Sequence, residues 1–146
     1  MSNLDSPSFA ATLHVRDHCL CLHAQRAARA LARRFDAVLR PLGLTSGQFS
    51  LLNALNRPQP PGMAPVAALL AMDRTTLTAA LKPLARQGYV QVLQDPTDGR
   101  ARKLLLTEAG RALLGRALPV WQATHAEVEA PLGDAGALRA GLRALG

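Results

Sequence analysis

Residues 66–107 constrain the fold of this chain more than any other stretch, because four short elements follow one another there in a fixed order. Apolar residues at helical spacing predict helices over residues 64–71 and 74–87. Two strand-like runs follow, over residues 89–93 and 101–106, and the tip between them is charged and rich in turn-forming residues. This order predicts a helix-turn-helix followed by a β-hairpin wing, in a mainly α fold.

The second of these helices has recognisable ends and a clear apolar stripe. Asp73 suits its N-cap, and Gly88 suits the residue that ends it. Pro83 lies inside the helix and removes one backbone hydrogen bond, so we predict a kink near this residue. The residues expected to face inward from the two helices are Val66, Leu69, Leu70, Leu77, Leu81 and Leu84.

The outer face of the second helix and the wing carry side chains that can contact duplex DNA. An arginine can donate two hydrogen bonds to guanine, and a threonine can contact a thymine methyl group or a phosphate. Asp98 would repel phosphate, so we expect it to pair with Arg100 and hold that side chain in position. A solvated helix face and a generic basic hairpin are the alternatives for each element taken alone. The expected DNA-contacting residues are Arg74, Thr75, Thr76, Thr78, Ala79, Lys82, Asp98, Arg100, Arg102 and Lys103.

The composition favours a polyanionic partner and excludes several classes of protein. A net charge of +7 suits DNA, RNA or an acidic membrane. Aromatic residues are only 3%, too few to stack single-stranded bases, so duplex DNA is favoured over RNA. An apolar content of 49% excludes a disordered chain, and no apolar run approaches the roughly 20 residues of a membrane span. Without a signal-peptide pattern, and with only two cysteines, we expect a cytoplasmic protein that has no disulfide framework and no membrane partner.

Long helical patterns flank the central stretch. Residues 10–40 predict one uninterrupted helix, which is either a plain core helix or one that packs against a second subunit. A helix over residues 48–56 follows, capped by Thr45 or Ser46. Residues 57–62 contain three prolines and predict a surface connection.

The C-terminal part predicts two further helices. The first begins at Thr107-Glu108, with a bend or a new segment at Pro119, and extends to about residue 130. Asp134 caps the last one, which carries Leu138, Leu142 and Leu145. We therefore divide the chain into an N-terminal arm and dimerisation helix (1–43), a winged helix-turn-helix (44–107) and C-terminal dimerisation helices (108–146).

A cluster of cysteine and histidine lies in the first long helical pattern. On a continuous helix, His14, His18 and Cys21 would share one face. The simplest interpretation is that these cysteines and histidines are buried in the interface of a dimer. Redox sensing through Cys19 or Cys21 is the second interpretation. Metal binding is the weakest, because two cysteines two residues apart point about 200° away from each other on a helix. We expect neither a metal nor a cofactor.

An enzyme is the rival class of function. The chain has no glycine-rich phosphate loop, no G-x-S-x-G motif and no H-E-x-x-H motif. A hydrolase built on cysteine and histidine would need a third orienting group and an oxyanion hole, and the sequence supplies no candidate for either. We therefore expect a binding protein, with non-specific DNA or RNA binding as the alternative to a sequence-specific regulator.

Three motifs resemble the MarR family of winged-helix transcription regulators. LTSGQFSLLNAL (44–55) is similar to the helix before the helix-turn-helix, and MDRTTLTAALKPLARQGYV (72–90) to the recognition helix and the strand after it. DPTDGRARKLLLTEAGRAL (95–113) matches the wing and the glycine-containing helix start. Relatives with the DRTTLT stretch often carry arginine at the position of Ala79, so one DNA contact is expected to be missing.

The resemblance implies a homodimer that binds a pseudo-palindromic operator, usually as a repressor that a small aromatic or anionic ligand releases. It also implies a ligand cleft between the dimerisation and DNA-binding regions. In the peroxide-sensing branch of the family, tyrosines activate the cysteine, whereas this chain has Phe49 at one such place. The residues expected to line the cleft are His14, Arg16, His18, Phe49, Trp121 and His125.

Overall fold

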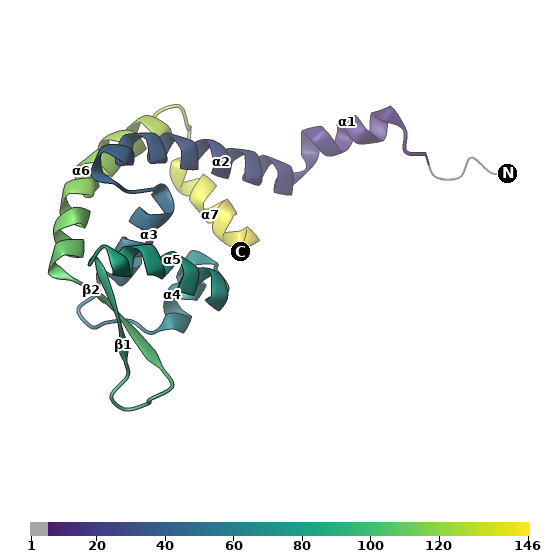
Figure 1. The fold of residues 1–146 in the computed structure, drawn as a ribbon. Helices are drawn as coiled ribbons and strands as arrows, with labels where there is room; N and C mark the ends of the chain where they lie inside the picture. Colours follow the sequence, from purple (N-terminus) through teal and green to yellow (C-terminus); the bar gives the residue numbers. More distant parts are fainter. Residues whose placement is uncertain (1–5) are drawn as a thin grey trace.

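The computed structural model describes residues 6–146, which form seven α-helices and a two-stranded antiparallel sheet (Figure 1). The N-terminal helices are α1 (Phe9–His18) and α2 (Leu20–Leu39), and a 3₁₀ turn, η1 (Arg40–Leu42), follows them. The central elements are α3 (Ser46–Leu55), α4 (Met63–Leu70), α5 (Arg74–Arg86), β1 (Val90–Gln94) and β2 (Arg102–Leu106). The chain ends with α6 (Glu108–Glu129) and α7 (Ala135–Leu145). The predicted mainly α fold with a hairpin is confirmed.

One hydrophobic core holds the central elements together, and α3 lies in its middle. Helix α3 packs against α2, α4, α6 and β2, and α4 packs against α5. Leu51 and Leu52 of α3 and Leu77 and Leu84 of α5 are almost fully buried, and each such side chain stabilises the fold by about 1.5–3 kcal/mol. The predicted apolar stripe of α5 is therefore correct, and it fixes which face of this helix remains outside.

The hairpin is joined both to α4 and to the core. Its register pairs Val90 with Leu106 and Val92 with Leu104. Val90, Leu104 and Leu106 are buried, whereas Val92 is exposed. The backbone N–H of Leu104 also donates to the carbonyl of Pro61, with an N–O distance of 2.8 Å, so the segment before α4 lies along the second strand. The hairpin therefore projects from the core with a fixed base (Figure 1).

A tight joint connects the end of α5 to the start of α6. Gly88 has φ of 81°, a left-handed conformation that ends α5 at low cost. The hydroxyl of Thr107 donates to the Gly88 carbonyl at 2.6 Å, and the backbone N–H of Thr107 donates to the Tyr89 carbonyl at 3.1 Å. Thr107 also caps α6 by accepting from the N–H of Gly110 at 3.0 Å.

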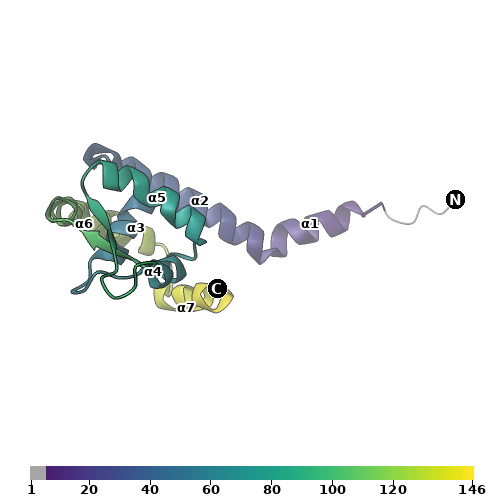
Figure 2. The ribbon, with the colours of Figure 1, turned by 60° about the horizontal axis from the view of Figure 1, so that its bottom comes forward.

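The prediction of one helix over residues 10–40 is wrong, because the chain leaves helical geometry at Cys19. This residue has φ −67° and ψ 110°; it ends α1 and N-caps α2, its sulfur accepting from the N–H of Leu22 at 3.4 Å. The apolar periodicity continues on both sides of the break, so spacing alone does not reveal it. His14, His18 and Cys21 therefore do not share a face of one continuous helix. No residue of α1 is buried, and α1 projects away from the other elements (Figures 1 and 2).

Two further expectations about the helices have different outcomes. The prediction that Leu69 faces inward is wrong, since its side chain is 59% exposed and lines open hollows beside α3 instead of packing into the core. Both α5 and α6 continue as unbroken helices through Pro83 and Pro119, so Pro119 starts no new segment. The kink at Pro83 stays a prediction. In the part of the chain that the structure describes, none of the helices has the length and apolarity needed to cross a bilayer.

Candidate nucleic-acid interface

The outer face of α5 begins at a well-defined cap. The Asp73 carboxylate accepts from the backbone N–H of Thr76 at 2.7 Å, and this bond lowers the pKa of Asp73 below its ordinary value. The hydroxyl of Thr78 donates to the carbonyl of Arg74 at 2.8 Å, so its lone pairs and its methyl group remain available to a ligand. All the residues expected to contact DNA from this helix are exposed: Arg74, Thr75, Thr76, Thr78, Ala79 and Lys82.

The tip of the hairpin is built from hydrogen bonds between side chains and backbone. Asp95 accepts from the N–H of Thr97 at 2.9 Å and from its hydroxyl at 2.8 Å. The backbone N–H of Thr97, with further help from its hydroxyl and from Lys103, lowers the pKa of Asp95. One guanidinium nitrogen of Arg102 donates to the carbonyls of Gly99 and Ala101, both at 3.2 Å. The tip therefore has a defined shape.

The expected ion pair between Asp98 and Arg100 is absent from residues 6–146. The Asp98 carboxylate instead accepts from the backbone N–H of Arg100 at 3.0 Å. Two residues of separation in a tight turn bring that N–H within reach, while the arginine side chain extends outward. The guanidinium of Arg100 thus has no carboxylate partner among the described residues.

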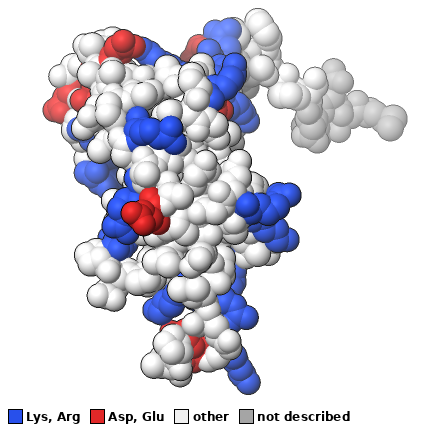
Figure 3. Space-filling view, turned by 60° about the vertical axis from the view of Figure 1, so that its left-hand side comes forward, with Lys and Arg blue, Asp and Glu red and all other residues white. Residues whose placement is uncertain are grey.

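An open basic hollow of about 360 Å³ lies between the hairpin and helices α4 and α5. Its walls bring together Arg74 from α5 and three cations of the hairpin, namely Arg100, Arg102 and Lys103. The N-terminus of α4 also lines it, and Asp98 is the one acidic residue among the described residues of its walls. Four cations against one carboxylate favour an anion such as a phosphate. Basic side chains surround this end of the molecule in Figure 3.

The six residues expected to line a ligand cleft fall into two separate groups within the chain. Phe49 and Trp121 have ring centroids 6.2 Å apart, and those of Trp121 and His125 are 4.5 Å apart. The other three residues, His14, Arg16 and His18, lie on the projecting helix α1. The break at Cys19 and the lack of packing partners for α1 keep the two groups apart.

The cysteines and histidines do not form a metal site. Cys19 is half-buried, Cys21 is exposed, and both are free thiols. His18 and His23 direct their Nδ1 atoms to the backbone carbonyls of His14 and Cys19, at 2.9 and 2.7 Å. Among residues 6–146 there is no group of three or more side chains placed to hold a metal ion.

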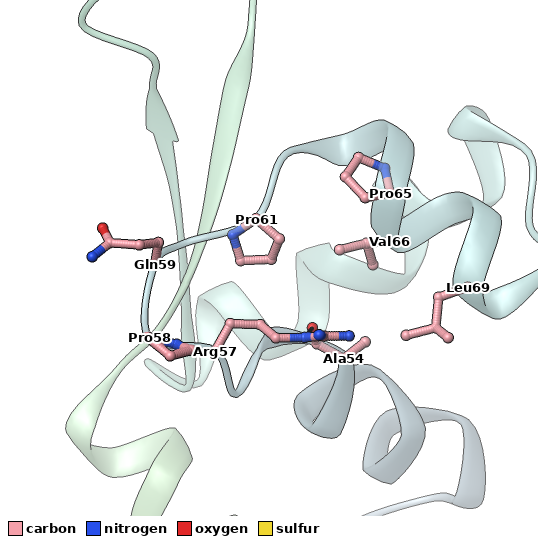
Figure 4. Close-up of a pocket in the computed structure, with 8 residues that line it drawn as sticks. All are labelled: Ala54, Arg57, Pro58, Gln59, Pro61, Pro65, Val66 and Leu69. Atoms are coloured by element: carbon pink, nitrogen blue, oxygen red, sulfur yellow. Dashed lines mark hydrogen bonds between the residues drawn. The ribbon is translucent and has the colours of Figure 1, made fainter.

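The sequence did not predict two hollows on the side of the winged helix-turn-helix region (residues 44–107). The first, of about 360 Å³, lies beside the loop between α3 and α4 (Figure 4). It is lined by Ala54, Arg57, Pro58, Gln59, Pro61, Pro65, Val66 and Leu69. The second, of about 350 Å³, is lined by Phe49, Ser50, Asn53, Ala54, Leu69, Leu118 and Trp121. In the sequence, only the three prolines of the loop pointed to these hollows. Prolines are as typical of a plain surface loop as of the wall of a pocket.

A short helix, a turn, a second helix with an exposed polar face and a basic hairpin define a winged-helix DNA-binding fold. The MarR family profile matches residues 44–101. The M. tuberculosis transcriptional regulator MosR, in a crystal structure with DNA, is 39% identical with a TM-score of 0.81, over 88% of this chain and 93% of that one. The chain belongs to the MarR family, whose characterised relatives are transcriptional regulators rather than enzymes.

Two other relatives extend the comparison. The repressor CouR of Rhodococcus jostii, bound to a 23-mer DNA duplex, is 25% identical with a TM-score of 0.75, over 97% of this chain and 96% of that one. The regulator TtmR of Methylorubrum extorquens is 32% identical over 100 residues, which are 68% of this chain and 51% of the relative. The chain thus spans about half the length of the curated relative.

Proposed function

We propose that this protein is a homodimeric, sequence-specific repressor that binds a pseudo-palindromic operator and is released by a small ligand. The observation that carries the proposal is the junction of the exposed α5 face with the basic hollow of the wing. Arg74 belongs to both, so one surface offers base-reading side chains next to phosphate-binding ones. Of the relatives described above, MosR was crystallised with DNA, and CouR has a structure bound to a DNA duplex.

An exposed apolar groove supports the homodimer. Helices α2 and α7 face each other across a hollow of about 580 Å³ whose walls are almost entirely apolar. Leu20 and Leu31 of α2 and Leu138, Leu142 and Leu145 of α7 are exposed there. A monomer in water would leave this surface unprotected, so a second copy is the natural partner. We accordingly assign dimerisation to residues 1–43 and 108–146, and DNA binding to residues 44–107.

Repression and ligand release rest on separate observations. CouR carries the name of a repressor. The stacked rings of Phe49, Trp121 and His125 lie where α6 packs against α3. A flat ligand that inserts there would shift two elements that set the spacing of the DNA-binding lobes. This arrangement favours an aromatic effector.

Fluorescence anisotropy with the chain's own promoter region tests the DNA-binding part. We expect nanomolar, salt-sensitive binding to a site whose halves lie about one helical turn apart, and far weaker binding to random duplex or RNA. Arg100→Ala should weaken binding to every sequence, and Thr78→Ala should change base preference. Arg116→Ala, on the exposed side of α6, is the control. Equal affinity for promoter and random duplex would favour the non-specific alternative.

Light scattering after size-exclusion chromatography tests the dimer. Leu142→Asp places a charge in the α2–α7 groove and should give a monomer with a folded winged helix. A wild-type protein that is monomeric at micromolar concentration would contradict the assignment.

Redox control through Cys19 or Cys21 is the second candidate. It is favoured by the exposure of Cys21 next to the half-buried Cys19 at the α1–α2 joint. An organic peroxide should then consume the free thiols and weaken operator binding in the wild-type protein but not in Cys21→Ser. DNA affinity that does not change after complete thiol oxidation would exclude this control.

A further inference from the structure

The loop at the tip of the hairpin depends on side chains for its shape. Strand β1 ends at Gln94 and β2 begins at Arg102, which leaves residues 95–101 as the loop between them. Hairpin loops usually have about two to five residues, so this one is long. Within residues 95–101 the backbone makes two hydrogen bonds across the loop, both of 3.0 Å. Neither of them reaches the peptide unit that joins Gly99 to Arg100.

Side chains hold both polar groups of that peptide unit. The carbonyl of Gly99 accepts from Nε2 of Gln94 at 2.7 Å and from Nη1 of Arg102 at 3.2 Å. The N–H group of the same unit, that of Arg100, donates to the carboxylate of Asp98 at 3.0 Å. A Cβ at position 99 would lie 3.1 Å from Nε2 of Gln94, so a glycine there leaves room for the first of these bonds. We call Gln94, Asp98 and Arg102 the tip clamp.

The tip clamp determines how the side chain of Arg100 leaves the backbone. The carbonyl and the N–H lie on opposite edges of a planar peptide unit, so hydrogen bonds to both prevent the plane from rotating. On the other side of Arg100, the N–H of Ala101 donates to the carbonyl of Asp98. The guanidinium of Arg100, in contrast, has no carboxylate partner in residues 6–146. The base of this side chain is therefore held, and its charged end is free for a ligand.

Arg102 differs from Arg100 in what it leaves for DNA. Nη1 of Arg102 donates to two carbonyls of the tip, those of Gly99 and Ala101. Its charge still adds to the basic hollow, but this end of its fork is occupied. Gln94 carries no charge and cannot add to the attraction of phosphates. The contacts thus separate an arginine that extends outward from two side chains that hold the tip.

We propose that Gln94 and Arg102 are positioning residues, which hold the peptide unit between Gly99 and Arg100 and so direct Arg100 at DNA. A tip that is already ordered loses less conformational entropy when DNA binds, and this raises affinity without an added contact. For Arg102 this role differs from the direct DNA contact that the sequence predicts. The role in binding rests on the proposed repressor function, whereas the ordering of the tip by the clamp does not.

Backbone ¹⁵N relaxation of the full-length protein without DNA measures the order of the tip. We expect heteronuclear NOE values for Gly99 and Arg100 close to those of β1 and β2 in the wild type. Gln94→Met removes the amide donor with little change in length or charge, and it should lower these values by making the tip mobile on the ps–ns timescale. Gln91→Met is the matched control, because it makes the same change at an exposed glutamine of the same strand. Equal NOE values at the tip in the two variants would overturn the proposal.

Fluorescence anisotropy with the operator then tests whether this order contributes to binding. Gln94→Met loses one hydrogen bond of the clamp and should weaken binding about fivefold. Arg102→Lys keeps the charge without the planar fork and should weaken binding in the same way. The slope of log affinity against log salt should stay that of the wild type in both variants, because no charge is lost. Gln91→Met should bind like the wild type.

A double-mutant cycle with Arg100 separates positioning from direct contact. If Gln94 acts through Arg100, Gln94→Met should weaken binding no further once Arg100→Ala has removed the side chain that the clamp orients. The same absence of a further loss is expected for Arg102→Lys. Losses that add in full to that of Arg100→Ala would mean that the clamp residues contact DNA themselves, and would overturn the proposal.

The measurement without DNA keeps this proposal separate from the proposed repressor. A tip whose order depends on Gln94, in a protein that binds no operator, would support the ordering by the clamp and overturn the proposed function. Operator binding that needs Arg100 but is unchanged in Gln94→Met and Arg102→Lys would support the proposed function and overturn the positioning role.

Discussion

Gly110 is the residue at which the joint between α5 and α6 is most sensitive to substitution. A Cβ at this position would lie 2.2 Å from the carbonyl oxygen of Tyr89 and 2.7 Å from Cδ1 of Leu106. Real Cβ atoms essentially never come closer than 3.0 Å to such atoms. Gly110→Ala therefore has to push the first turn of α6 away from Tyr89 by roughly 1 Å in a closely packed region.

The magnitude follows from what this displacement disturbs. Overpacking of this kind costs about 1–3 kcal/mol. The same shift breaks the two hydrogen bonds from Thr107 to the carbonyls of Gly88 and Tyr89, at about 1 kcal/mol each. The better helix propensity of alanine returns about 1 kcal/mol. We expect a net decrease of about 2–4 kcal/mol in the free energy of unfolding, or roughly 5–15 °C in Tm.

Gly115→Ala is the matched control, because it makes the same change in the same helix at a position where a Cβ meets nothing within 4 Å. It should stabilise the protein by up to about 1 kcal/mol. Both variants are followed by circular dichroism in thermal and urea unfolding, at one protein concentration because a dimer's stability depends on it. If Gly110→Ala unfolds at the same temperature as Gly115→Ala, the close approach of α6 to Tyr89 does not constrain the fold.

Three further variants test other parts of the structure. Ala71 has φ of 52°, so Ala71→Gly should raise the free energy of unfolding by about 0.5–1 kcal/mol in urea, while Ala68→Gly within α4 should lower it. The lowered pKa of Asp73 contributes stability that is present above the ordinary value of 3.8 and disappears as the pH falls through the lowered value. Asp73→Asn keeps a cap without this titration, so its urea midpoint should fall less than that of the wild type between about pH 5 and pH 2. Lys82→Ala should reduce the slope of log affinity for DNA against log salt by about 0.9 for each phosphate that is no longer neutralised, measured by anisotropy, while Arg116→Ala should leave the slope unchanged.

The central elements could be predicted from the sequence because their signals are local. Asp73 and Gly88 mark the two ends of α5 through capping chemistry that acts over three or four residues. The stripe of Leu77, Leu81 and Leu84 determines which face of the helix is buried. The outward face and the order of helix, turn, helix and hairpin then follow without knowledge of distant contacts.

The break at Cys19 could not be predicted in this way. Cysteine is not among the residues that usually cap helices, and the apolar spacing is the same on both sides of it. What decides between one helix and two is tertiary packing, and α1 has no buried residue with which to hold a continuous helix straight. The same break explains why the residues expected to line a ligand cleft lie in two groups, one on α1 and one where α3 meets α6.

The two hollows beside α3 show a different reason why a surface escapes prediction from sequence. Their lining residues come from α3, the following loop, α4 and α6, and two of these residues, Arg57 and Trp121, are more than sixty residues apart in the chain. No spacing rule links them; only the packing of α3 against α6 places them on one surface. The exposure of Leu69 has the same origin, because a leucine at a helical core spacing predicts burial until its neighbours are known. Local patterns therefore predict the surface proposed to meet DNA, whereas hollows that could hold a small molecule depend on how the helices pack. A change at Arg57 or Leu69 would alter these hollows and leave every expected DNA-contacting residue in place.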